Sequence, residues 1–279
     1  MVFSRRRFLQ ASIATVAVGT GLYTWRVEPH WLELVRRELD IHALPAELEG
    51  KLLVQLSDLH VGQRVDDDYV RGAFRRVAAL APAVVVYTGD FVSYWPGVFD
   101  QVERVYAEMP RGTLATLGVL GNHDYGPGWA HPELAERLCR ALQPLGLDVL
   151  RNETRQVGGL TVAGLDDFLG PSFDPASTLA SLPPTEPTLV LSHNPDSADE
   201  PVWGSYRGWI LAGHTHGGQC KPPLLRPPLL PIRNPRYAAG EIALADGRRL
   251  YVNRGVGHLL QVRFNVRPEI TAFTLRRAS

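Results

Sequence analysis

The chain has 279 residues, of which 45% are hydrophobic and 21% are charged, as in an ordinary globular protein with one substantial core. Its 29 basic and 29 acidic residues balance, so no electrostatic footprint for nucleic acid exists and no nucleic-acid partner is expected. Only two cysteines are present, Cys139 and Cys220, which excludes a disulfide framework and a cysteine-based zinc site.

The first 30 residues have the layout of an export signal. A basic cluster precedes an uncharged, largely apolar run over residues 8–25, and SRRRFLQ at residues 4–10 is similar to the pattern that the Tat translocase recognises. The run has about the minimum length of a membrane span. We expect residues 1–30 to be a Tat-type signal or membrane anchor and residues 31–279 to form an exported domain, periplasmic or otherwise extracytoplasmic. Cleavage stays open, and a helix of the mature domain is the alternative.

After a linking segment at Pro29–Leu44, short apolar runs alternate with helical patterns. The runs have the length of buried strands and are Leu52–Ser57, Ala83–Asp90, Thr113–Asn122, Thr188–Asn194 and Trp209–His214. A helical pattern follows each of the first three runs, and these patterns predict helices over Asp66–Leu80, Val98–Met109 and Pro132–Leu145.

Shorter strands complete the pattern. Three are expected before the fourth long run, at Leu147–Leu150, Thr154–Val157 and Leu160–Leu165, and three near the end of the chain, at Ala238–Leu244, Arg249–Asn253 and Glu269–Leu275. The loop Pro222–Pro235 is rich in leucine and proline. It either contacts lipid or packs on the second sheet, and both interpretations stay open.

Each predicted core strand ends in a polar cluster, and the clusters share one chemistry. They read SDLHVG, TGDFVS, GNHDYG, SHNP and GHTHGG. In open α/β sheets the loops at the carboxyl ends of the strands converge on the ligand site. The clusters can therefore gather Asp58, His60, Asp90, Asn122, His123, Asp124, His193, His214 and His216 in one place.

Carboxylate, amide oxygen and imidazole together suit manganese, iron or zinc. The set is too large for one ion, and seven ligands with one shared carboxylate fill two adjacent sites with positions left open. Two metal ions can clamp the attacking and leaving oxygens of a displacement, and a hydroxide between them can attack near neutral pH. Phosphorus is the natural electrophile, because phosphoryl oxygens can bridge both ions.

The order DLH, GD, GNHD, H and GHTH resembles the five motifs of the calcineurin-like metallophosphoesterase superfamily, through roughly Leu52 to Gly218. The resemblance implies an α/β fold, a four-layer αββα sandwich of two mixed β-sheets flanked by helices. The Tat-like start, GHTHGGQ and the RGVG…RF…PEI tail (Arg254 to Ile270) are similar to a bacterial exported or membrane-associated phosphodiesterase branch. Some relatives there cleave phosphodiesters, and others cleave the pyrophosphate of UDP-diacylglucosamine in lipid A synthesis.

The resemblance also implies a role for each residue. Two divalent metal ions are expected, with manganese favoured and iron or zinc as alternatives. The first is held by Asp58, His60 and His216, the second by Asn122, His193 and His214, and Asp90 bridges them. His123 faces the substrate, stabilising charge and protonating the leaving oxygen, and Asp124 orients its imidazole.

The expected activity is hydrolysis of a phosphodiester or pyrophosphate bond, with a lipid or cell-envelope compound as a candidate substrate. The alternatives are a UDP-2,3-diacylglucosamine pyrophosphatase and a scaffold that binds metal without catalysis. A scaffold is expected to lack some ligands, and none is missing here.

Other polar residues have weaker claims. We expect a solvated turn at Asp166-Asp167 and a bystander at Cys220. Arg254 and Arg263 are candidates for a phosphate contact, because guanidinium groups match phosphate oxygens.

Overall fold

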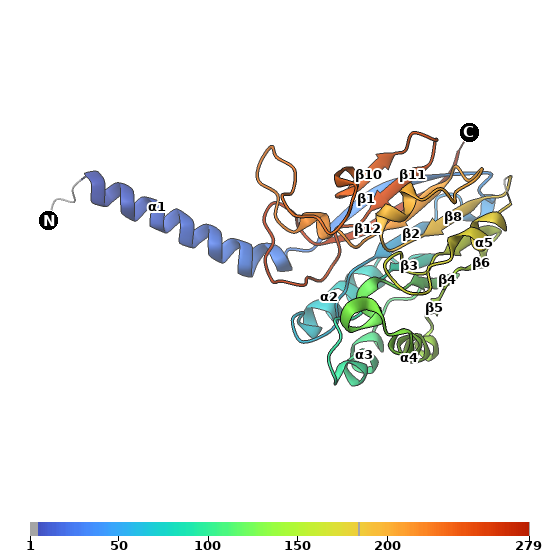
Figure 1. The fold of residues 1–279 in the computed structure, drawn as a ribbon, viewed down its shortest axis with the longest axis horizontal. Helices are drawn as coiled ribbons and strands as arrows, with labels where there is room; N and C mark the ends of the chain where they lie inside the picture. The colour runs from blue at the N-terminus through green and yellow to red at the C-terminus, as the bar shows by residue number, and fades with distance from the viewer. Residues whose placement is uncertain (1–4, 184, 279) are drawn as a thin grey trace.

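Two six-stranded sheets packed face to face form the centre of the molecule (Figure 1). The structure, a computed structural model, describes residues 5–183 and 185–278. The first sheet has the order β1 (Glu33–His42), β12 (Glu269–Ala278), β2 (Leu52–Leu56), β3 (Val84–Thr88), β4 (Ala115–Val119) and β5 (Asp148–Val149). The second has the order β10 (Gly240–Ala243), β11 (Arg249–Val252), β9 (Trp209–Ala212), β8 (Thr188–Leu191), β7 (Leu160–Gly164) and β6 (Glu153–Val157).

Both sheets are mixed. In the first, β12 pairs antiparallel with β2 and the other pairs are parallel. In the second, the two outer pairs are antiparallel and the inner three are parallel. Parallel strands covered on both faces read as continuous apolar runs, which is how β3, β8 and β9 read in the sequence.

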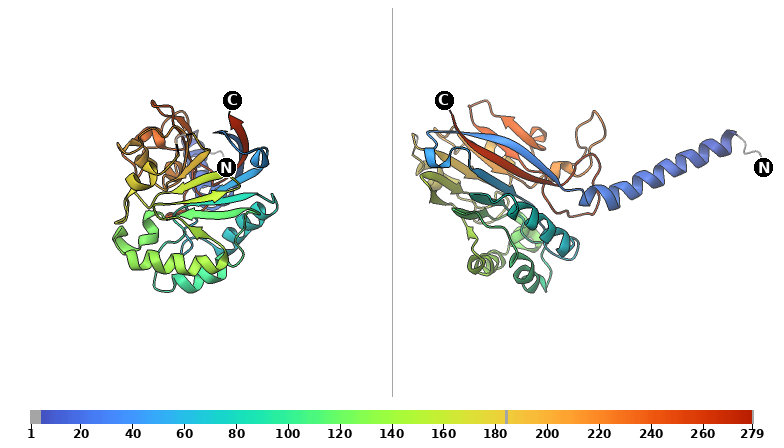
Figure 2. Two further views of the ribbon diagram at one scale, coloured as in Figure 1. Left: turned by 90° about the vertical axis from the view of Figure 1, so that its right-hand side faces the viewer. Right: turned by 180° about the vertical axis from the view of Figure 1, so that it is seen from behind.

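The core is divided into three apolar layers. The middle layer joins the facing sides of the sheets, for example Leu53 and Val84 of the first with Leu189 and Leu211 of the second. The helices α2 (Asp67–Ala78), α3 (Val98–Tyr106) and α4 (Pro132–Leu142) cover the outer side of the first sheet, as both views of Figure 2 show. The short α5 (Pro175–Ala180) and irregular segments cover the second sheet. The predicted four-layer αββα sandwich is therefore confirmed.

The segment predicted as a linker, Pro29–Leu44, is instead part of the fold. Its centre forms strand β1, which pairs with β12 over ten residues. The strand lies at the edge of the first sheet and most of its side chains are not buried, so its sequence, ELVRRELDIH, lacks the apolar run of a central strand. Helix α5 was also missed, because six residues are too few to establish a helical period.

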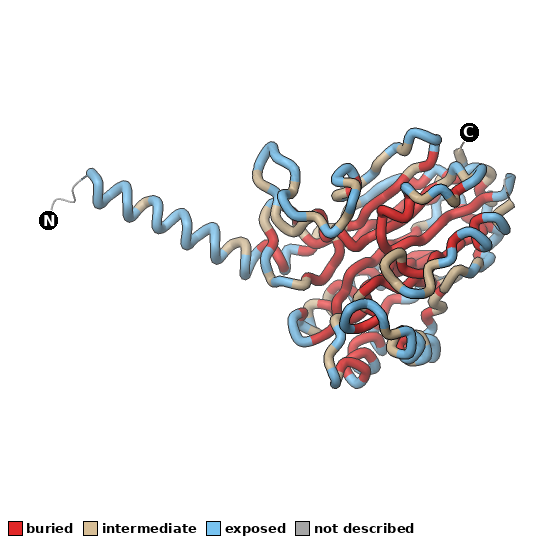
Figure 3. The backbone as a smooth tube through the Cα atoms, viewed as in Figure 1, coloured by how far each residue is buried: buried red, intermediate tan, exposed pale blue. Residues whose placement is uncertain are grey.

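Helix α1 (Arg5–Leu22) extends away from the body of the molecule, and nearly all of it is exposed (Figure 3). Residues 1–4 of the predicted signal, including Ser4, lie outside the described residues. No helix in the described part of the chain is both long and apolar enough to cross a membrane. At the foot of α1, the carboxylate of Glu28 is buried and accepts a hydrogen bond from the backbone N–H of Val266 at 2.5 Å.

Candidate metal centre

The polar clusters predicted at the strand ends meet at one edge of the sandwich. Strands β2, β3 and β4 deliver theirs from the first sheet, and β8 and β9 from the second. Gln55 links the two sheets just beneath, because its amide donates to the carbonyl of Ala212 and to the hydroxyl of Thr88, both at 2.9 Å.

Six of the seven predicted ligands form two compact groups. Asp58, His60 and His216 make one group, and Asp90, His193 and His214 make the other; within each, one ligand atom per residue lies within 4.8 Å of the others. The imidazoles face each other closely, with 3.0 Å between the Nε2 atoms of His60 and His216. Groups of this composition suit a divalent metal ion each, so the centre is dinuclear.

Asp90 lies between the two groups. Its Oδ2 is 3.5 Å from Nε2 of His60 in the first group and 3.3 Å from Nε2 of His193 in the second. Its Oδ1 accepts a hydrogen bond from the backbone N–H of His123 at 2.9 Å, which fixes the carboxylate. This position fits the predicted bridging role.

Asn122 supplies an independent test of whether the centre fits a metal. Its side-chain oxygen and nitrogen are buried, and neither has a hydrogen-bond partner among the described residues. A buried amide without partners is costly, and native proteins rarely keep one without a purpose. The amide oxygen is a suitable ligand for a divalent cation, so Asn122 fits the role predicted for it.

Hydrogen bonds select which nitrogen each histidine offers. Nδ1 of His193 lies 2.7 Å from the carbonyl of Thr88, so this nitrogen carries the proton and Nε2 is left for a metal. His214 is the opposite case, since its Nε2 lies 3.1 Å from the carbonyl of Pro231 and its Nδ1 faces His193. Such partners behind the ligands fix ring orientation and tautomer.

The backbone is strained at most of the ligands. Asp58, His60, Asp90, His214 and His216 all have positive φ angles, between +48° and +71°. This left-handed conformation is unfavourable for residues other than glycine. Strained residues concentrate at functional sites, where the surrounding structure holds them in place. Here each of these residues lies two or four positions after its strand, and its side chain is buried at the centre.

Burial keeps two of the imidazoles neutral. It lowers the pKa of His60 to about 3, and burial together with the charge of His193 lowers that of His214 to about 4. Neutral imidazole is the form that binds metal. Burial raises the pKa of Asp58 to about 7, with Asp90 adding to the effect, and a bound cation would favour the ionised carboxylate.

His123 lies beside the ligands without joining either group. Its ring is 5.1 Å from that of His60 and 6.2 Å from that of Trp129, and it is only partly buried, so it can reach a substrate. Within the described residues, the carboxylate of Asp124 forms no hydrogen bond to this ring. It accepts hydrogen bonds from the backbone of Val92 and Gly121, so it holds the loop that carries His123 rather than the imidazole itself.

A cavity of about 630 Å³ opens above the two groups. Its floor includes Asp90, Asn122, His214 and His216. Its wall is apolar and includes Leu229, Leu230, Leu260 and Val262. The partly exposed Cys220 lines the wall and is not a member of either ligand group. Sequence analysis missed Trp129 and Leu260, because loops far apart in the chain form this wall.

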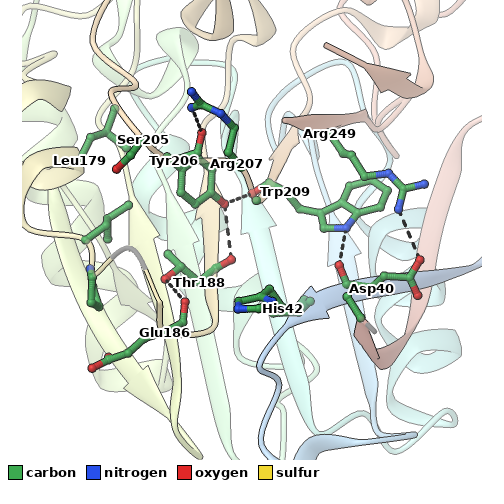
Figure 4. Close-up of a pocket in the computed structure, with 15 residues that line it drawn as sticks. Asp40, His42, Leu179, Glu186, Thr188, Ser205, Tyr206, Arg207, Trp209 and Arg249 are labelled. Atoms are coloured by element: carbon green, nitrogen blue, oxygen red, sulfur yellow. Dashed lines mark hydrogen bonds and ion pairs between the residues drawn. The ribbon is translucent and has the colours of Figure 1, made fainter. Parts of the chain in front are cut away.

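A second cavity, of about 420 Å³, lies where β8 and β9 begin, at the opposite edge of the second sheet (Figure 4). Several of its polar groups bond to one another. The indole N–H of Trp209 donates to the carbonyl of Asp40 at 2.9 Å, and the hydroxyl of Tyr206 donates to the carbonyl of Trp209 at 2.6 Å. Nothing there resembles the chemistry of the metal centre.

The prediction of a solvated turn at Asp166-Asp167 is wrong. Asp166 and Asp167 are buried rather than solvated. Asp166 pairs with the guanidinium of Arg151 at 2.9 Å and accepts a hydrogen bond from the hydroxyl of Tyr125. Oδ2 of Asp167 is buried without a partner in the described structure, and burial raises the pKa of this residue to about 7. The VAGL run before them gave no signal of a partner so far away in the chain.

Neither arginine proposed for a phosphate contact is free for one. Arg254 forms ion pairs with Glu269 and Glu33. Arg263 is fully buried and donates to the carbonyls of Arg254, Gly255 and Gly257. Its guanidinium also lies 3.3 Å from Nδ1 of His216, so it supports the centre from behind.

Several known proteins are similar to this chain. Residues 52–218 match the model of the calcineurin-like phosphoesterase family. The chain is 34% identical to phosphodiesterase YaeI of Escherichia coli, over 98% of this chain and all of the relative, and 29% identical to UDP-2,3-diacylglucosamine pyrophosphatase LpxG of Chlamydia muridarum, over 92% and 94%. Among solved structures, a dimetal phosphatase from Danio rerio aligns with a TM-score of 0.46 at 13% identity, over 75% of this chain and 88% of that one.

Proposed function

Because the chain belongs to the calcineurin-like phosphoesterase family and is a phosphoester hydrolase, we propose that it cleaves a phosphodiester or pyrophosphate bond. The observation that carries the proposal is the pair of ligand groups, with Asp90 between them, on the floor of an open cavity. A structural metal site is a closed shell of protein ligands, whereas this floor is open to substrate.

The bound metal ions would supply Lewis acidity and lower the pKa of water. The protein's own groups do the rest. Asp58, Asp90 and Asn122 would contribute oxygen ligands and the histidines nitrogen ligands, and buried hydrogen bonds hold the carboxylates of Asp58 and Asp90 in place. His123, at the edge of the cavity, stabilises the charge that develops on the phosphoryl group and gives a proton to the leaving oxygen.

The apolar wall favours a substrate with an apolar substituent on the phosphoryl group. Leu229, Leu230 and Leu260 stand above the ligands, where a free monoester would leave them exposed to water. The similarity to LpxG makes a UDP-2,3-diacylglucosamine pyrophosphatase the second candidate, because that substrate joins acyl chains to a pyrophosphate. Every ligand of the motif set is present, which argues against a scaffold without catalysis.

The N-terminal segment supports export. SRRRFLQ followed by an uncharged run is the arrangement on which we base a Tat-type signal or anchor and an extracytoplasmic location. The location test is fractionation of cells that express the full chain or its Arg5→Lys/Arg6→Lys variant. Export of the parent and retention of the variant in the cytoplasm are expected, and equal export of both would contradict the Tat assignment.

The test of the activity compares bis-p-nitrophenyl phosphate with p-nitrophenyl phosphate, using the full chain with manganese, iron or zinc added in turn. We expect the diester to be cleaved faster. Faster cleavage of the monoester would contradict the proposed substrate class. Bound metal with no turnover of either compound, or of a UDP-linked acylated sugar, would favour the scaffold.

A further inference from the structure

The exposed apolar side chains of this protein are concentrated in three segments. All but three of the large ones in the described residues lie on residues 8–31, on the loop 224–229 or on residues 260–262. Leu224 is fully exposed, and Leu229 and Leu260 are 79% and 64% exposed. The three exceptions are Tyr94, Leu114 and Trp129. Exposed apolar side chains scattered singly are ordinary, but a cluster of this size marks a contact surface.

Hydrogen bonds join residues 260–263 to the foot of α1 and to Gln219, which precedes the loop 224–229. The backbone N–H of Arg263 donates to the carbonyl of Thr24 at 2.9 Å, and the amide of Gln261 donates to the carbonyl of Trp25 at 3.1 Å. The amide of Gln219 donates to the carbonyls of Leu260 and Val262 at 2.9 and 2.8 Å. Figure 1 shows the two loops beside the foot of the helix, and the right-hand view of Figure 2 agrees. We call this surface the rim, defined by Trp25, Leu224, Leu225, Leu229, Leu260 and Val262.

The charge of the rim is one-sided. The net charge of the chain is zero, yet residues 1–27, 204–240 and 254–268 contain no aspartate or glutamate. The same segments carry exposed basic side chains next to the apolar ones, among them Arg26, Lys221 and Arg226. Arg26 lies 4.0 Å over the indole of Trp25. Apolar residues flanked by tryptophan and arginine, without carboxylates, are typical of protein surfaces in contact with anionic lipid.

The rim is also the entrance to the metal centre. Leu229, Leu260 and Val262 belong both to the rim and to the wall of the cavity whose floor holds His214 and His216. A surface that contacts the rim would therefore stand directly over the opening.

We propose that the rim docks on an anionic lipid bilayer, so that the cavity opens onto the membrane and receives a lipid-linked phosphoester directly from it. This inference rests on the proposed function, because it takes the cavity to be the place where the substrate enters. It goes beyond an N-terminal anchor, because it assigns the contact to two loops of the catalytic domain. An anchor alone would leave these loops in water.

The experiment places a fluorophore on the rim. Leu224→Trp adds an indole at a position that does not line the cavity. Leu114→Trp is the matched control, since Leu114 is 49% exposed and directly precedes β4, at the end of that strand away from the metal centre. The full chain is added to vesicles of equal parts phosphatidylcholine and phosphatidylglycerol that carry bromine on their acyl chains. Bromine quenches indoles only within the lipid.

We expect most of the emission added by Leu224→Trp to be quenched and that added by Leu114→Trp to survive. Vesicles of phosphatidylcholine alone should quench Leu224→Trp less, because the basic side chains lose their partners. Equal survival of both signals would overturn the proposal, as would equal quenching in neutral vesicles. If light scattering then shows a dimer that Leu224→Ser/Leu225→Ser dissociates, the rim instead joins two copies.

Turnover of bis-p-nitrophenyl phosphate, a soluble diester, is measured on the same samples. Full turnover with an unquenched Leu224→Trp would overturn the docking and leave the proposed function standing. A chain that is quenched as expected but cleaves no phosphoester would contradict the proposed function instead.

Discussion

Replacing Asn122 should change the stability of the protein in opposite directions with and without metal. Both of its amide atoms are buried without partners among the described residues. An unpartnered buried polar group costs about 1–3 kcal/mol, and leucine has a similar size with no polar atom. Asn122→Leu should therefore raise the free energy of unfolding of the chelator-treated protein by about 1–3 kcal/mol.

With metal present the order should reverse. A ligand at 1,000 times its dissociation constant stabilises the folded state by about 4 kcal/mol, and Asn122→Leu loses one ligand of the second ion. The assay is thermal unfolding followed by circular dichroism, in chelator and in saturating manganese. For a chain of this size each kcal/mol shifts the melting temperature by about 2–4 °C, so both changes are measurable.

Asn253→Leu is the matched control. Asn253 is equally buried, but its amide is satisfied, since it donates to the hydroxyl of Thr271 and accepts from the backbone N–H of Gly255, both at 2.8 Å. This variant should be less stable than the parent under both conditions. If Asn122→Leu also ranks below the parent in chelator, or above it in both conditions, the role assigned to Asn122 is wrong.

Three further substitutions test separate parts of the account. His123→Ala should lower turnover by about 100- to 10,000-fold and leave the metal content unchanged; loss of metal would make His123 a ligand. Burial raises the pKa of folded Asp167 from its ordinary value of 3.8 to about 7. Between these two pH values the folded state binds more protons than the unfolded state, so the stability of the chelator-treated protein should fall as the pH rises from about 4 to about 7. Urea titrations from pH 4 to pH 8 should show a smaller fall for Asp167→Asn, and an equal fall would place the effect elsewhere. Arg151→Ala leaves the buried carboxylate of Asp166 without its ion-pair partner and should lower the free energy of unfolding by about 3–5 kcal/mol. Arg155→Ala removes an exposed ion pair and should lower it by about 1 kcal/mol or less. Equal losses in urea titrations would contradict this difference.

The central strands and the ligand set were predictable because each depends on local sequence. A buried parallel strand such as VVVYT is a short apolar run, and its carboxyl end fixes where the next polar residues lie. That is why Asp90 after β3 and His214 after β9 could be placed at one edge before any contact between them was known.

What the sequence concealed depends on contacts between distant segments. Strand β1 exists because β12, more than 200 residues later, pairs with it. The burial of Asp166 depends on Arg151 and Tyr125 from other loops. The sequence left open whether the proline-rich loop contacts lipid, because it does not show that Gln261 and Arg263, far along the chain, bond to the foot of α1. The periodicity of apolar residues along the sequence does not predict such contacts.

The most direct test of the dinuclear centre is the metal content of the full chain and of Asp90→Asn, measured by mass spectrometry together with turnover of bis-p-nitrophenyl phosphate. Asp90 faces both ligand groups, so the change should remove metal and activity together, while the parent binds about two ions per chain. Full activity in Asp90→Asn with its metal retained would refute the bridging role. A parent chain that binds no metal would contradict the account at its centre.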